Sequence, residues 1–192
     1  MPVPARRRFL VLAALAGLGT RAVAQPDGAD AGWAALARPG AIVLFRHATA
    51  PGVGDPPQFR LGDCGTQRNL SEEGRAEARR LGEQFRRRGI QVGAVLTSQW
   101  CRARETAQLA FPGQVREEPA FNSTFGRGGG DERQTARARA LLHDWRGPGA
   151  LVVVSHQVNI QALAGVSTSS GEGIVLRRTA DGRLEVAGRV TS

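Results

Sequence analysis

The chain has 192 residues, 41% of them hydrophobic and 22% charged. These values are ordinary for a globular protein and exclude a low-complexity chain, and the length suffices for one domain with a buried core. The net charge is +9 and all 26 basic residues are arginines, whose guanidinium groups favour bidentate contact with phosphate or carboxylate.

The N-terminal segment 1–24 predicts a signal peptide. It holds an arginine cluster, an apolar stretch from Phe9 to Leu18, and Ala22-Val23-Ala24 directly before Gln25. This is the three-part layout of a secretory signal. An uncleaved anchor or a buried helix is the alternative, but a spanning helix needs about 20 apolar residues. We therefore expect a periplasmic or secreted protein with no stable membrane span after processing.

The route of export stays open. The stretch "RRRFL" at residues 6–10 resembles the twin-arginine signal, but any basic segment in an arginine-rich protein can imitate it, so general secretion is the alternative. The segment 1–24 carries four arginines and no acidic residue, and its removal lowers the net charge from +9 to +5. This smaller charge on an exported protein argues against nucleic acid as a partner.

The sequence after residue 24 predicts strands that alternate with helices. Residues 25–40 predict a polar tail and a short helix ended by Pro39-Gly40, and residues 48–69 predict a long loop of the kind that is usually functional. Further strands are expected at 41–45, 92–96 and 150–156, further helices at 71–90, 99–110, 133–145 and 157–164, and a hairpin at 173–177 and 183–186.

Alternating strands and helices predict an α/β fold with a parallel sheet, in one domain spanning 41–192. Ligands of such sheets bind at the carboxyl ends of the strands. That rule brings together Arg46-His47 after the first strand, "TSQWCR" (97–102) after the second, and Ser155-His156 at the end of the third.

The expected cluster of Arg46, His47, Arg102 and His156 suits phosphoryl chemistry. Two guanidinium groups can grip a dianionic phosphate. A neutral imidazole can attack phosphorus, and a second, protonated imidazole can stabilise the charge of the transferring oxygens. A zinc site from the three histidines and two cysteines is the alternative, but no C-x-x-C or H-x-x-x-H spacing supports it.

These residues resemble the histidine phosphatase superfamily, the phosphoglycerate-mutase-like fold, in its branch 1. Arg46-His47-Ala48 resembles the R-H-G signature, and "NLSEEGRAEARRLG", "TSQWCRARETA" and "VVVSHQVNI" resemble later motifs in the family's order over 41–188. The resemblance implies a single-domain α/β/α sandwich with a mostly parallel sheet. It implies His47 as the nucleophile that becomes phosphohistidine, Arg46 and Arg102 as phosphate ligands, and His156 as the second catalytic histidine, with no metal or other cofactor.

The chain departs from the family at the general acid. Asn122 and Ser123 stand where many members carry Glu or Asp, and Ala48 replaces the usual glycine. The candidates for a substitute acid are Glu117, Glu118, Asp131 and Glu172, and the sequence does not rank them.

The expected function is an exported, metal-independent phosphomonoesterase. The closest resemblance is to exported bacterial members such as the phosphatase of the lipopolysaccharide core heptose, which implies a small phosphorylated substrate such as a sugar phosphate or lipopolysaccharide. A phosphohistidine-protein phosphatase and a non-catalytic anion-binding module are the alternatives. Because Cys64 and Cys101 both border the expected pocket and the compartment is oxidising, we predict a disulfide between them, with two free thiols as the alternative.

Overall fold

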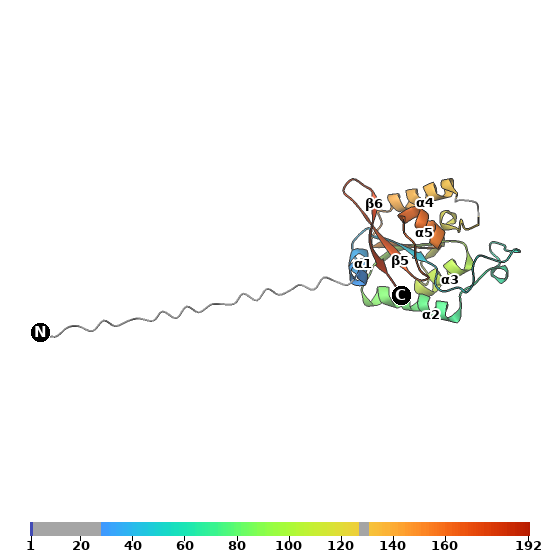
Figure 1. Ribbon diagram of the computed structural model, residues 1–192, viewed down its shortest axis with the longest axis horizontal. Helices are drawn as coiled ribbons and strands as arrows, with labels where there is room; N and C mark the ends of the chain where they lie inside the picture. Colours follow the sequence, from blue (N-terminus) through green and yellow to red (C-terminus); the bar gives the residue numbers. More distant parts are fainter. Residues whose placement is uncertain (2–27, 127–130) are drawn as a thin grey trace.

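A computed structural model describes Met1 and residues 28–126 and 131–192 (Figure 1). The predicted signal peptide, apart from Met1, lies outside the described residues, as does most of the glycine-rich stretch 126–132. No helix of the described residues has the length and apolar character needed to cross a membrane.

The centre of the fold is one six-stranded sheet with the order β3-β2-β4-β1-β5-β6. The first four strands in this order run parallel, β5 pairs antiparallel with β1, and β6 pairs antiparallel with β5. The predicted mostly parallel sheet is therefore confirmed. The strands are β1 (Ile42–Arg46), β2 (Val92–Thr97), β3 (Val115–Glu117), β4 (Ala150–Ser155), β5 (Gly173–Arg178) and β6 (Leu184–Val190).

Helices cover both faces of the sheet, because the central strands are apolar on both sides. Along β1, Val43 and Phe45 belong to one core cluster and Ile42 and Leu44 to the other. The first cluster is closed by α1 (Gly28–Leu36), α2 (Glu72–Arg87) and α3 (Cys101–Ala110), the second by α4 (Glu132–Asp144) and α5 (Gln157–Ala164). The predicted three-layer α/β/α sandwich is therefore confirmed (Figure 1).

Side-chain caps determine two of the helix starts. Ser71 accepts a hydrogen bond from the backbone N–H of Gly74 at the start of α2, and Asp131 caps α4 in the same way. Two acidic residues in the first turn of α2 and two arginines in its last turn complement the helix dipole.

The sequence missed the shortest elements. Strand β3 has three residues and lies at the edge of the sheet, and two short 3₁₀ helices, η1 (Cys64–Thr66) and η2 (Pro119–Phe121), interrupt segments read as loops. Segments this short give no periodic pattern. Helix α1 starts at Gly28, three residues before the predicted helix 31–40, and its Trp33 and Leu36 belong to the core.

The predicted disulfide is confirmed, since Cys64 is bonded to Cys101 with a Cα–Cα distance of 5.7 Å. It ties η1, in the long loop after β1, to the first residue of α3. Closing a loop across a sequence separation of 37 residues contributes about 4 kcal/mol to stability in the chain-entropy treatment. The same link excludes a zinc site that uses these two cysteines.

Candidate active site

Three strand ends meet at one edge of the sheet, as expected from the parallel order β2-β4-β1. A cavity of about 220 Å³ opens there. Its lining residues are Arg46, His47, Gly52, Val53, Gly54, Arg68, Arg102, Ser123, Phe125, His156, Gln157 and Val158. All four predicted site residues line this cavity, and the ring centroids of the two histidines are 5.4 Å apart.

The hydrogen bonds of His47 determine its tautomer. Its Nδ1 lies 2.8 Å from the carbonyl oxygen of Ala48, which can only accept, so Nδ1 carries the proton. Arg102 Nε donates to His47 Nε2 over 3.2 Å, which requires a lone pair on Nε2. The neutral imidazole therefore directs an unprotonated nitrogen at the guanidinium group, as a nucleophile for phosphorus requires.

Both imidazoles are neutral at neutral pH. Burial, the largest effect, and the positive charges of nearby arginines together lower the pKa of His47 to about 3, against the opposing effect of the hydrogen bond to Ala48. These arginines are Arg102, Arg68 and Arg46. Burial also lowers the pKa of His156 well below its usual value, and the neighbouring His47 and the same three arginines act in the same direction. The protonated second imidazole expected from the sequence therefore requires a bound phosphate, whose negative charge would raise the pKa of His156.

The depressed pKa of His47 predicts a loss of stability in acid. The unfolded chain binds a proton on this imidazole below pH 6.5, whereas the folded protein does so only near pH 3. The free energy of unfolding should therefore be fully retained above pH 6.5 and fall by about 1.4 kcal/mol per pH unit as the pH drops from 6.5 toward 3. Denaturant unfolding at several pH values gives the free energy of unfolding of the wild type and of His47→Gln, and the difference between them isolates the contribution of His47. If the two free energies changed with pH in the same way, the low pKa of His47 would be contradicted.

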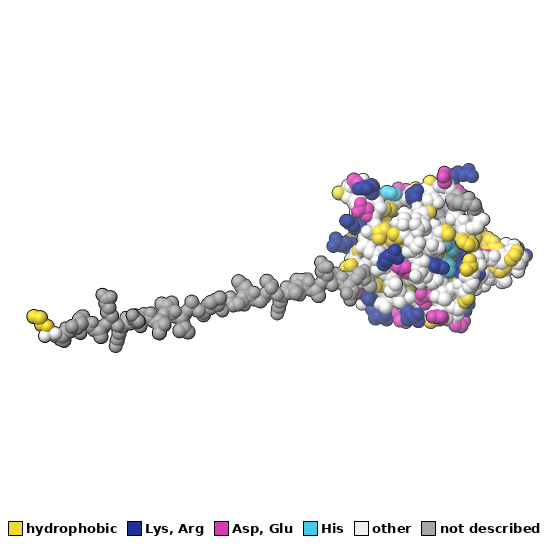
Figure 2. All heavy atoms as spheres, viewed as in Figure 1, with side chains coloured by type: hydrophobic (Ala, Val, Ile, Leu, Met, Phe, Trp, Pro, Cys, Tyr) yellow, Lys and Arg dark blue, Asp and Glu magenta, His cyan; other side chains and the backbone are white. Residues whose placement is uncertain are grey.

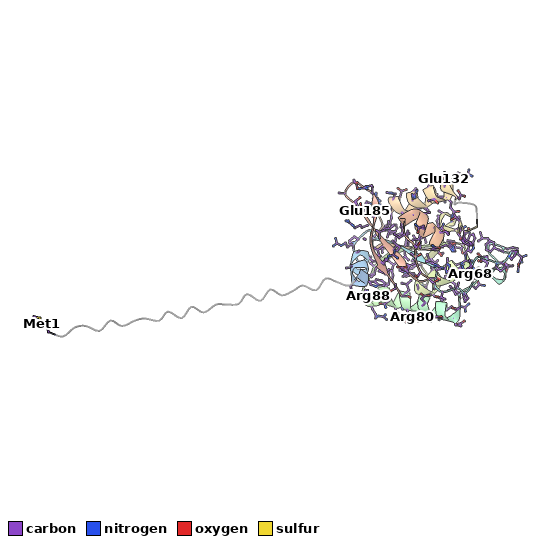
Figure 3. All side chains as sticks on the ribbon, in the orientation of Figure 1. Met1, Arg68, Arg80, Arg88, Glu132 and Glu185 are labelled. Carbon is purple, nitrogen blue, oxygen red and sulfur yellow. A yellow bond between two sulfur atoms is a disulfide. The ribbon has the colours of Figure 1, made fainter. Side chains whose placement is uncertain are left out.

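Three guanidinium groups contribute positive charge to the cavity. Arg46 ends β1, Arg102 lies in the first turn of α3, and Arg68, which the sequence analysis missed, comes from the long loop (Figure 3). Burial lowers the pKa of all three, and in Arg68 and Arg102 it outweighs the opposing effect of the Asp55 carboxylate. A signal for Arg68 existed: it stands just before α2, whose N-terminus lies at the same sheet edge as the end of β1.

One carboxylate, Asp55, holds this cluster together, and the sequence analysis missed it as well. Its Oδ1 accepts from Arg102 Nη1 at 2.8 Å and from the backbone N–H of Arg68 at 3.0 Å, and its Oδ2 accepts from Trp100 Nε1 at 3.0 Å. These bonds lower the pKa of Asp55 against the opposing effect of burial, which is the largest single contribution. Asp55 is thus an ionised positioning residue and holds no proton to donate.

A polar network fixes His156. Its Nε2 lies 2.9 Å from Ser98 Oγ, which also bonds Asn122 Oδ1 at 3.3 Å. The same Asn122 oxygen accepts from the backbone N–H of Gln99 at 2.8 Å. Asn122, which stands where a general acid was expected, therefore joins the end of β2 to the segment before α4 and orients the second histidine.

None of the four candidate acids lines the cavity. Glu117 pairs with an arginine of α3, and Glu118 caps η2 through the backbone N–H of Ala120. Asp131 caps α4, and Glu172 pairs with an arginine of β6. The structure therefore favours none of these four unranked candidates, because each carboxylate is used by the local structure. Within the described part of the chain, the cavity lining contains no carboxylate.

Several solved structures with the same fold are phosphatases by their titles. The protein histidine phosphatase SixA complexed with tungstate is 17% identical, with a TM-score of 0.58 over 79% of this chain and 96% of that chain. A putative α-ribazole-5'-P phosphatase from Escherichia coli is also 17% identical, with a TM-score of 0.60 over 79% and 96%. A mycobacterial glucosyl-3-phosphoglycerate phosphatase is 20% identical, with a TM-score of 0.56 over 79% and 99%.

The sequence itself gives the family. No curated protein matches the chain in a sequence search. The sequence model described as "Histidine phosphatase superfamily (branch 1)" matches residues 42–146, which are more than half of the chain and include His47, Arg68 and Arg102. The chain therefore belongs to branch 1 of the histidine phosphatase superfamily.

Proposed function

We propose that the protein is an exported phosphomonoesterase that works through a phosphohistidine on His47. The observation that carries this proposal is the unprotonated Nε2 of His47 beside Arg102, in a cavity that holds three guanidinium groups. A dianionic phosphate compensates that charge and can receive bidentate hydrogen bonds from the arginines.

The reaction has two displacements. In the first, the lone pair of His47 Nε2 forms a bond to phosphorus, the ester P–O bond breaks, and the leaving oxygen keeps the electron pair and takes a proton from solvent. In the second, water attacks the phosphohistidine, the P–N bond breaks, its electron pair returns to Nε2, and inorganic phosphate leaves. Arg46, Arg68 and Arg102 stabilise the phosphoryl oxygens in both steps. Bound phosphate also raises the pKa of His156 and so favours its protonated form, because a nearby negative charge stabilises the imidazolium.

The cavity without a carboxylate predicts a steep dependence on the leaving group. For a series of substituted phenyl phosphates, kcat/KM, which reports the step in which the phenol departs, should fall strongly as the pKa of the phenol rises, because no acid in the lining protonates the departing oxygen. Steady-state kinetics over phenols from 4-nitrophenol to phenol measures the slope, with chelator added as a control that should change nothing. A flat dependence would show that an acid does act, and failure to hydrolyse even 4-nitrophenyl phosphate would favour a non-catalytic anion-binding module.

The same observation favours a second candidate, a phosphohistidine-protein phosphatase. The leaving group is then an imidazole nitrogen, which needs no carboxylic acid when its ring is already protonated. The fold shared with the protein histidine phosphatase SixA agrees with this candidate. Comparison of kcat/KM for a phosphohistidine peptide and for phenyl phosphate separates the two, since the second candidate requires a strong preference for the peptide.

Export is supported by the signal-like segment and by the disulfide, which forms in oxidising compartments. We expect the mature protein from its native host to begin at Gln25, because Ala22-Val23-Ala24 suits signal peptidase. Intact-mass measurement of the soluble protein tests this, with a protein expressed without residues 1–24 as the mass standard. A soluble protein that retains the segment would contradict export by this signal.

A further inference from the structure

The mouth of the cavity differs in chemistry from its floor. The floor carries the three guanidinium groups and the two imidazoles, whereas the remaining lining residues are uncharged. We call this second set the rim: Gly52, Val53, Gly54, Ser123, Phe125, Gln157 and Val158. Only Ser123 and Gln157 of the rim have polar side chains, so it offers few partners to a polyhydroxylated group.

The two largest apolar contributions to the rim are exposed. Val53 is 88% and Phe125 57% exposed, and both belong to the few large hydrophobic side chains that the described residues leave in solvent. Figure 2 shows hydrophobic side chains gathered beside a histidine on the side of the molecule where the loop after β1 projects. Apolar surface next to a charged pocket marks a binding site more often than a chance exposure.

The rim is held in place by a residue of the floor. Arg68 Nε donates to the carbonyl of Gly54 at 2.8 Å, and Asp55 bonds the backbone of Arg68. Gly52 and Gly54 have φ values of 87° and 70°, and this left-handed pair turns the backbone on both sides of Val53. A Cβ on Gly54 would lie 3.6 Å from the Phe125 ring, so the two apolar segments approach each other across the mouth.

We propose that Val53 and Phe125 determine specificity for phosphate monoesters whose leaving group presents an apolar surface next to the phosphate. This inference rests on the proposed function, because it assigns the phosphate to the floor and the leaving group to the rim. A leaving group bound there covers apolar area on Val53 and Phe125 that water otherwise contacts, which favours binding by roughly 25 cal/mol per Å². An unsubstituted sugar phosphate gains little from this rim.

Binding of non-hydrolysable alkylphosphonates tests the proposal without turnover. By calorimetry on the full mature protein, affinity should rise about twofold to fourfold for each methylene added from methylphosphonate to hexylphosphonate. Val53→Thr and Phe125→Ser should each flatten this increase and leave the affinity for methylphosphonate unchanged. Val186→Thr, at an exposed apolar residue of β6 outside the cavity lining, is the matched control and should behave like the wild type.

A second test measures kcat/KM for two phosphate esters whose leaving groups have similar pKa values but differ in polarity. Phenols with a 4-butyl and a 4-(2-hydroxyethyl) group have similar pKa values, so the first phosphate should show the larger kcat/KM, and both rim variants should remove the difference. Binding of methylphosphonate without any effect of chain length would overturn the rim proposal alone. Failure of methylphosphonate and inorganic phosphate to bind at all would overturn the proposed function. A third outcome would also overturn the rim proposal. If the wild type sediments with phosphatidylglycerol vesicles, Val53→Thr and Phe125→Ser do not, and phosphonate affinity is independent of chain length, the rim binds a membrane surface instead.

Discussion

The His47→Ala variant is expected to lose at least about 10⁴-fold in kcat and to form no covalent phosphoenzyme. His47 Nε2 is the one imidazole nitrogen that the hydrogen bonds assign as an unprotonated acceptor within reach of Arg102. Rapid quenching of the wild type with a labelled aryl phosphate should trap a phosphorylated protein that is labile in acid and stable in base, as an N-linked phosphate is. The variant should show neither the label nor turnover.

The fold should survive this substitution, because His47 lines the cavity although its side chain is buried. Water from the cavity can fill the vacated space, so the variant should keep its circular dichroism spectrum and a cooperative thermal transition. His143→Ala is the matched control, since this histidine lies at the end of α4 beside Arg178 and outside the cavity lining. Near-normal turnover in His47→Ala, or label retained on the protein, would show that another group is the nucleophile.

The sequence predicted the parts of the site that regular structure positions. Arg46, His47 and His156 end or directly follow buried strands, and Arg102 lies in the first turn of a helix after another. A parallel sheet brings such strand ends to one edge whatever the details of the loops are. The helix over 157–164 was predicted with its observed bounds for the same reason, since it begins where the buried strand β4 stops.

The sequence did not predict what depends on loop conformation. Asp55 reaches Arg102 only because of the path of the long loop after β1, and turns held by glycines and side-chain bonds leave no periodic pattern. The search for an acid near Asn122 failed for a related reason. Glu118 and Asp131 are close in sequence to the expected position, but both side chains cap local backbone N–H groups instead of facing the cavity.

Arg102→Ala is expected to lower kcat/KM by roughly a hundredfold to several thousandfold, equivalent to about 3–5 kcal/mol of transition-state stabilisation. Arg102 is only 3% exposed. Its guanidinium group contacts the Nε2 atom of His47 at 3.2 Å and the Oδ1 atom of Asp55 at 2.8 Å. Its removal deletes a phosphate ligand and leaves the Asp55 carboxylate facing a bound anion without its main counter-charge. Both KM and kcat should change, because the phosphate dianion is bound less well in the ground state and in the transition state.

Arg104→Ala is the matched control for this prediction, because it removes a guanidinium two residues along the same helix. Arg104 pairs with Glu117 at 3.2 Å and does not line the cavity, so its loss should change kcat/KM by less than about threefold. Arg102→Lys separates charge from geometry: it keeps the positive charge but replaces the planar fork, and should recover only part of the lost rate. Equal effects of Arg102→Ala and Arg104→Ala would indicate that general positive charge, and not the placement of Arg102 between the nucleophile and Asp55, drives phosphate binding.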